Sequence, residues 1–177
     1  DGLGDAGTDW QNEIYQNALS HDHNVSFSGS FSNIPYRVSL GYNNTNGLLK
    51  YSNIQRSTVD LALNPSFLNN TLKFDLNGKI AMINNDFSNN DAIWSAVEFD
   101  PTQPIFNGNT TYGGYTAWIE SSDPDQLNGA PNNIATHNPV ARLEFVDDQS
   151  KVFRYFGNAK AEYNLPFLPE LKATLKG

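Results

Sequence analysis

Aromatic side chains in the middle of the chain are the residues whose types best suit ligand binding. Trp94, Tyr112, Tyr115 and Trp118 fall within a stretch that lacks regular periodicity. Flat aromatic rings can stack on sugar rings, and the Tyr hydroxyl and Trp N–H add a polar rim. The alternative is that these rings pack the loops together or belong to a belt of aromatic residues. We retain the four positions as candidate ligand contacts.

Two groups of residues could bind a metal. His21 and His23 lie two residues apart, so a strand would place both on one face. No third ligand is close in sequence, and we expect solvated polar side chains there. Asp123, Asp125 and Asn128-Gly129 have the composition of a calcium loop, but their spacing fails the EF-hand pattern. The sequence therefore predicts no metal site and no cofactor.

Catalytic signals are weak. Glu98, Asp100 and Glu120 could supply a carboxylate pair for glycoside hydrolysis. Nothing in the sequence fixes their separation, and carboxylates in a loop are usually solvated. The chain also lacks a nucleophile elbow, a P-loop and a dinucleotide fingerprint. We therefore expect a protein that is not an enzyme.

Composition narrows the possible partners. The 177 residues contain 11 Lys and Arg against 19 Asp and Glu, which gives a formal net charge of -8. No basic stripe is present, so we expect no nucleic acid partner. The chain has no cysteine, no apolar run of transmembrane-helix length and no signal peptide at its start. We expect it to begin after an export signal or inside a longer protein.

The stretch from Ser57 to Asn84 has the clearest pattern. Apolar and polar residues alternate on two arms, which a tight connection at 64–70 joins. Side chains of a strand point to opposite faces in turn, so each arm has one apolar and one polar face. The alternating apolar residues are Val59, Leu61 and Leu63, then Leu72, Phe74, Leu76, Ile80 and Met82. The pattern predicts two antiparallel strands.

Similar alternation predicts further strands. They span residues 23–32, 36–42 and 151–165, and a last strand begins at Leu171. Asn46-Gly47 favours positive φ angles, so we expect a hairpin tip at 43–47. On the strand at 151–165, Phe153, Tyr155, Tyr163 and Leu165 share one face, opposite Arg154, Asn158, Lys160, Glu162 and Asn164.

The pattern breaks between residues 85 and 149. Asp91 is a possible N-cap for a helical segment that ends at Phe99, and Asn138-Pro139 should open a short helix through Phe145. For residues 8–19 we expect a short helix or an irregular segment that leads into the first strand. Irregular regions as long as 85–149 tend to be functional.

Connection lengths suggest the architecture. Short turns at 33–35, 65–70 and 166–170 alternate with longer connections, so a meander would place all the short turns at one end. Short turns at one end, long loops at the other and dyad alternation are typical of an outer-membrane β-barrel, with its apolar face toward lipid. A soluble β-sandwich, with its apolar face inward and 85–149 as a carbohydrate-binding surface, is the alternative.

Several segments resemble the barrel of SusC-like TonB-dependent outer-membrane transporters. The resemblance runs in order through 8–15, 23–29, 36–42, the Asn46-Gly47 tip, 63–68, 99–106 and 138–141. No single motif is specific, but the ordered series is, and it covers nearly the whole chain.

The resemblance implies an all-β fold, an antiparallel up-and-down meander that is a partial segment of a large transmembrane barrel. Residues 1–177 would form one partial barrel domain in the outer membrane, with 85–149 as an extracellular loop region and the plug domain absent. The family imports oligosaccharides or peptides beneath a SusD-like surface lipoprotein. Energy comes from the TonB complex, which acts through an N-terminal region that this chain lacks.

Overall fold

The computed structural model describes residues 3–32, 34–108, 110–120, 129–168 and 170–177. Its contacts define two compact units. The sheet unit comprises Ser20–Thr45, Ile54–Asn85 and Ser150–Gly177, and the loop unit comprises Asp1–Leu19, Asn46–Asn53 and Asp86–Gln149. The single domain expected over residues 1–177 remains a prediction.

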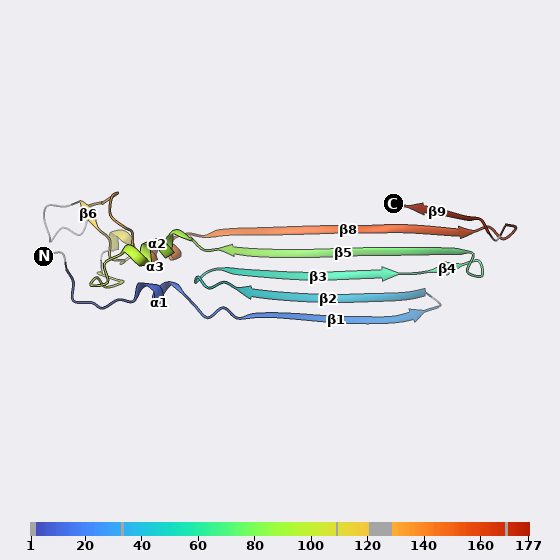
Figure 1. Ribbon diagram of the computed structural model, residues 1–177, viewed down its shortest axis with the longest axis horizontal. Coiled ribbons are helices and arrows are strands. Elements are labelled where there is room, and N and C mark those ends of the chain that lie inside the picture. Colours follow the sequence, from blue (N-terminus) through green and yellow to red (C-terminus); the bar gives the residue numbers. More distant parts are fainter. Residues whose placement is uncertain (1–2, 33, 109, 121–128, 169) are drawn as a thin grey trace. The chain divides into compact units, whose positions relative to one another are not determined.

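The sheet unit is a meander of long strands (Figure 1). Their bounds are β1 Ser20–Phe31, β2 Ile34–Asn46, β3 Asn53–Leu63, β4 Ser66–Phe67, β5 Leu72–Phe87, β8 Asp148–Asn164 and β9 Lys172–Lys176. The strands are ordered β1-β2-β3-β5-β8-β9, and the short β4 pairs with β5. Among the described residues, β1 and β9 each have a partner strand on one side only, so the sheet is open. The all-β, mostly antiparallel fold of a partial barrel segment is therefore confirmed.

The register separates an apolar face from a polar face. Val25 pairs with Leu40 in the antiparallel β1–β2 ladder, whereas the next pair along is Ser26 with Ser39, whose hydroxyls lie 2.8 Å apart. The large exposed residues of the apolar face are Val25, Phe27, Phe31, Tyr36, Leu40, Tyr42, Val59, Leu61, Ile80, Met82, Phe153, Tyr155, Tyr163 and Leu175. The predicted alternation is thus confirmed, and nothing among the described residues of the sheet unit covers this face.

The connection between β2 and β3 differs from the predicted tip. β2 continues to Asn46, and neither Asn46 nor Gly47 has a positive φ. Tyr51 has one instead, at 65°, and the Gly47 N–H donates to the Ser52 carbonyl at 2.8 Å. The prediction of a tip at 43–47 is therefore wrong. The physical reason is that Leu49 is buried in the core of the loop unit, which requires a longer connection than a two-residue turn.

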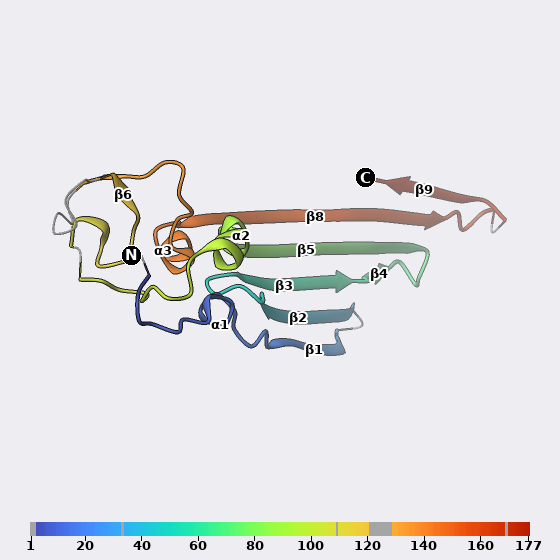
Figure 2. The ribbon, with the colours of Figure 1, turned by 60° about the vertical axis from the view of Figure 1, so that its left-hand side comes forward.

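Short helices form the core of the loop unit, and Figure 2 shows the three α-helices grouped together. The elements are α1 Trp10–Ile14, α2 Asp91–Glu98, η1 Thr110–Tyr112, β6 Ile119–Glu120, β7 Ala130–Pro131 and α3 Pro139–Glu144. Trp10 packs edge-on against Phe99, with ring centroids 4.9 Å apart. Ile14, Leu49, Ala92, Ala96 and Leu143 complete the buried cluster. No helix among the described residues is long and apolar enough to cross a membrane.

The start of α3 agrees with the sequence prediction, whereas the start of α2 differs from it. The Asn138 side chain accepts the N–H groups of Val140 and Ala141, and Pro139 follows it, as predicted for α3. In α2 the N-cap is Asn90, which makes no side-chain capping bond, and Asp91 is the first helical residue. The prediction of Asp91 as N-cap is wrong because the hydrogen-bonded turns begin earlier: the N–H groups of Ala92 and Ile93 donate to the carbonyls of Asn89 and Asn90.

Candidate functional site

The polar face of the sheet carries a cluster of paired charges and amides. A Cβ added at Gly41 would meet the Thr58 hydroxyl, so the side chain of Thr58 lies on the polar face, and Asp60 follows two residues later. The Lys79 ammonium lies 3.0 Å from an Asp60 carboxylate oxygen. The Asn77 amide donates to the Asn158 side-chain oxygen at 3.0 Å. One pair therefore joins β3 to β5, and the other joins β5 to β8.

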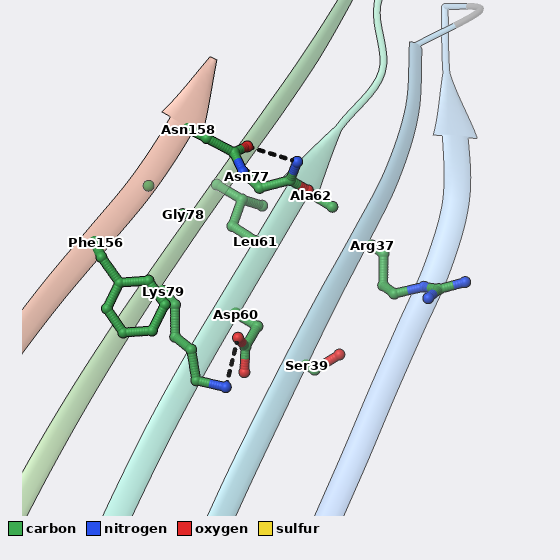
Figure 3. A pocket seen from close by; sticks show the side chains of 11 residues that line it. Arg37, Ser39, Asp60, Leu61, Ala62, Asn77, Gly78, Lys79, Phe156 and Asn158 are labelled. Carbon is green, nitrogen blue, oxygen red and sulfur yellow. Dashed lines mark hydrogen bonds and ion pairs between the residues drawn. The ribbon is translucent and has the colours of Figure 1, made fainter. Parts of the chain in front are cut away.

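Both pairs border a hollow of about 260 Å³. Figure 3 shows it, with the Asp60–Lys79 and Asn77–Asn158 interactions drawn as dashed lines. The other residues that line it are Arg37, Ser39, Leu61, Ala62, Gly78, Phe156 and Gly157. A Cβ at Gly157 would lie 2.7 Å from the Asn77 carbonyl oxygen. Glycine is therefore required there for the close approach of β5 and β8.

Phe156 is the unexpected member of this site. Its side chain is 60% exposed and borders the hollow together with Asn158 on β8. The sequence pattern assigns Phe153 and Tyr155 to the apolar face and Arg154 and Asn158 to the polar face, and it assigns Phe156 to neither. Strand parity alone could have found this residue, because even-numbered positions of β8 share the polar face.

The lining of the hollow suits the binding of a polar solute. The Asp60 carboxylate lies in an ion pair with Lys79. Phe156 offers an aromatic face to the hollow, and Asn77, Asn158 and, from β2, Arg37 offer hydrogen-bonding groups. An apolar ring with a polar surround can bind molecules that have both kinds of surface.

Three of the four predicted aromatic residues lie together in the loop unit. Tyr112, Tyr115 and Trp118 border a hollow of about 410 Å³, with Arg142 and Phe145. Tyr115 is buried, and its ring lies 4.7 Å from that of Phe106 and 5.4 Å from that of Phe145. Trp118 packs against the buried core, and the Tyr112 hydroxyl donates to the Gly129 carbonyl. These three rings stabilise the loop unit as well as lining its hollow.

Trp94 lies apart from the other three. It is 70% exposed on α2 and borders a second hollow of about 310 Å³. The two hollows share the segment from Ala135 to His137 and the side chain of Arg142. Arg142 in turn pairs with Asp91 at 3.3 Å. The four predicted residues therefore belong to neighbouring hollows of the loop unit, and ligand binding there stays a prediction.

The three candidate carboxylates have separate surroundings. Glu98 accepts a hydrogen bond from the Thr136 hydroxyl, and Glu120 lies in β6. Asp100 accepts the N–H and the hydroxyl of Thr102, each at 2.8 Å. These hydrogen bonds, the backbone one first, hold the pKa of Asp100 below its ordinary value, because they favour the charged form. Within the described residues, no hydrogen bond or ion pair joins any two of these three carboxylates.

The structure describes one of the two groups of candidate metal ligands. The imidazoles of His21 and His23 share a face, with ring centroids 5.1 Å apart. Asp123, Asp125 and Asn128 lie outside the described residues. Within the part of the chain that the structure describes, no group of three or more His, Cys, Asp or Glu residues could hold a metal ion.

The fold and the two faces define the class of protein. An open meander of long strands, apolar on one face and polar on the other, is a piece of a barrel wall. No protein-family model matches the chain. Curated relatives do match it: it is 41% identical to the TonB-dependent receptor SusC of Bacteroides thetaiotaomicron over 96% of this chain and 18% of that protein.

Two receptors of Formosa agariphila are more distant relatives. TonB-dependent receptor P3 is 28% identical over 97% of this chain, and TonB-dependent receptor P26 is 25% identical over 88% of it. The matches cover 16% and 14% of those receptors, so the chain spans less than a fifth of the length of these relatives. The chain belongs to the SusC-like TonB-dependent receptors, as a segment of their β-barrel region.

Proposed function

We propose that this chain forms part of the wall of an outer-membrane TonB-dependent importer. Its apolar face contacts lipid, and its polar face lines a water-filled lumen. The observation that carries this proposal is the exposed apolar face of the single-layered sheet. Soluble monomers rarely expose apolar patches larger than a few hundred Å², so this face requires an apolar environment.

The length of the apolar run supports a membrane rather than a soluble partner. On β5 the apolar face extends from Leu72 to Met82. Ten steps of about 3.4 Å give roughly 34 Å, and a tilt of 35–45° reduces that to about 24–28 Å. The apolar band of outer-membrane barrels is about 25 Å tall. A β-sandwich would need a second sheet over this face, and among the described residues the other sheet is the two-stranded β6–β7 pair of the loop unit.

Strand direction gives the proposed topology. The connections that join β1 to β2, β3 to β5 and β8 to β9 share one end of the meander, and those that follow β2 and β5 leave from the other. Outer-membrane barrels have short periplasmic turns and longer extracellular loops. The predicted loop region at 85–149, of which residues 88–147 join β5 to β8, is therefore extracellular in this proposal.

The proposed cargo is an oligosaccharide or a peptide, taken up with a SusD-like surface lipoprotein and powered by the TonB complex. This proposal rests on the similarity to SusC. In it, the hollow around Phe156 contacts cargo that crosses the lumen. Trp94 and the hollow of Tyr112, Tyr115 and Trp118 contact cargo or the lipoprotein outside. Stacking of a sugar on such a ring is worth about 1 kcal/mol per ring beyond area burial, by analogy with aromatic pairs.

Adjacent residues on β8 allow a direct test of the two faces. The chain has no cysteine, so Tyr155→Cys and Phe156→Cys can each carry one spin label in the intact protein, in a background free of other cysteines. In lipid vesicles the label at 155 should collide with oxygen, which concentrates in lipid, and the label at 156 with a water-soluble nickel chelate. The reverse pattern, or equal water access at both positions, would refute the lipid-facing assignment.

Cargo contact needs a separate measurement. Phe156→Ala should reduce uptake of oligosaccharide or peptide at normal surface abundance, by roughly tenfold if about 1.4 kcal/mol of contact is lost. Phe153→Ala, on the apolar face of the same strand, is the matched control and should leave uptake unchanged. Equal uptake by both variants would remove Phe156 from the cargo path without affecting the barrel assignment.

A further inference from the structure

The start of β1 brings two imidazoles together on the apolar face. His21 and His23 are both exposed, and their ring centroids lie 5.1 Å apart at an interplanar angle of 40°. The ring of Tyr42 lies 5.8 Å from that of His21. The sequence placed the two histidines on one face, and the structure adds that the rings are neighbours and open to solvent.

This spacing suits chelation of one metal ion. Imidazole nitrogens bind zinc at about 2.0–2.1 Å, so two nitrogens on one ion lie no more than about 4.2 Å apart. Rings with centroids 5.1 Å apart reach that separation through small side-chain rotations. Because alternate residues of a strand share a face, the backbone of β1 already holds both ligands on the same side.

The surroundings do not oppose a cation. His21 pairs with Asn44 and His23 with Tyr42 across the β1–β2 ladder, so the nearest cross-strand groups are an amide and a phenol. Asp22 lies on the polar face, where it accepts a hydrogen bond from Asn43 at 3.1 Å. The apolar face of β1 and β2 carries no Lys, Arg, Asp or Glu in the described residues. A bound ion would therefore meet neither a fixed positive charge nor a closed ligand shell.

We propose that His21 and His23 form a two-imidazole site for a divalent transition metal, with the remaining positions open to water. Imidazole ligands suit Cu²⁺, Ni²⁺ and Zn²⁺, and affinity for such sites increases from Ni²⁺ to Cu²⁺ and falls again at Zn²⁺. Carboxylate-preferring ions such as Ca²⁺ and Mg²⁺ are not expected to bind. Two protein ligands make an exchangeable site rather than a closed structural one.

The site does not depend on the importer assignment. His21 and His23 precede Val25, with which the large apolar residues of β1 begin, so the pair lies at the end of that run. In the proposed barrel this position is the rim of the lipid-facing band, where ions in water can reach it. Metal binding and membrane orientation are therefore tested by different experiments.

Binding of Cu²⁺ to the intact protein, stripped with EDTA, tests the pair. Titration calorimetry and electron paramagnetic resonance should show one Cu²⁺ with coupling to two nitrogens that is lost in both His21→Ala and His23→Ala, each with at least tenfold weaker binding. His137→Ala is the matched control, since His137 is the third histidine of the chain and lies in the loop unit. The control should bind as the unchanged protein does.

The result that would overturn the site is unchanged affinity and unchanged two-nitrogen coupling in both the His21 and His23 variants. A loss confined to His137→Ala would do the same. Both alanine substitutions replace exposed side chains. His21→Gln keeps a polar side chain of similar length, so it should lose the metal while the far-ultraviolet circular dichroism spectrum stays constant. Equal Ca²⁺ and Cu²⁺ affinities would also refute a histidine site.

Discussion

Replacing Leu61 with arginine tests the orientation of the whole sheet. Leu61 is the middle one of three alternating apolar residues near the end of β3, and its side chain is 42% exposed on the apolar face. A charge at the lipid face of an outer-membrane barrel costs about 2–4 kcal/mol near the midplane. That corresponds to roughly a 30- to 700-fold shift in the equilibrium between folded and unfolded protein.

Asp60→Arg is the matched control on the adjacent position. Asp60 lies on the polar face, and its ion pair with Lys79 joins side chains that are each 38% exposed. Loss of such a pair costs about 0–1 kcal/mol, because solvent screens the charges. Arginine also fits a wet lumen. We therefore expect Leu61→Arg to reduce barrel assembly well below the level of Asp60→Arg.

The assay is the fraction of intact protein that folds into lipid vesicles, measured by the heat-dependent shift of folded barrels in gel electrophoresis across a urea series. Surface abundance in cells gives a second reading. Equal folded fractions for the two variants, or a larger loss for Asp60→Arg, would mean that the polar face meets the lipid. Either result would contradict the proposed orientation.

Three further predictions concern the loop unit. Asn138→Ala removes the side-chain cap of α3 and the two hydrogen bonds that the Asn138 amide donates to the carbonyls of Ile105 and Thr116. The opening free energy measured by hydrogen exchange at residues 139–145 should therefore fall by about 2–4 kcal/mol. Because the pKa of Asp100 is lowered in the folded state, its stabilising effect is complete above the ordinary carboxyl range and is lost as the pH falls through the lowered value. Residues 4–8 are hydrogen-bonded to the 101–103 segment, so a fall in pH should release them. The release is measured as faster amide hydrogen exchange of residues 4–8, corrected for the intrinsic pH dependence of exchange. Asp100→Asn should remove this pH-dependent release. Trp118→Ala should lower the free energy of unfolding of the loop unit by about 2–3 kcal/mol, because its ring packs against the core. Trp94→Ala should change it by no more than about 0.5 kcal/mol, because that ring is exposed, and protease susceptibility measures both changes.

Local patterns were enough to predict most of the secondary structure. The alternation around Leu61 and Ile80 fixes which residues share a face, because the side-chain period of a strand is two wherever the strand is regular. Asn138-Pro139 predicted the start of α3, because capping depends on residues within one turn. The family resemblance likewise rested on short motifs in order along the chain, and the match to SusC bears it out.

Features that depend on distant contacts were the ones missed. Asn46-Gly47 has the composition of a tight turn, yet the turn moves to Tyr51 because Leu49 is buried against helices from other parts of the chain. Phe156 interrupts a polar face, and only the neighbouring strands β3 and β5 show that it borders a hollow. Local propensity cannot report either result, since both depend on residues more than 30 positions away.

The sequence by itself determined the strands, their two faces and the family. It could not determine which candidate residues meet, because a meander joins residues through strand register and packing rather than through spacing along the chain. The tertiary structure placed Tyr112, Tyr115 and Trp118 around one hollow, left Trp94 exposed beside another, and brought the rings of His21 and His23 within 5.1 Å. Those distances follow from backbone pairing and core burial, which are set by the whole chain at once.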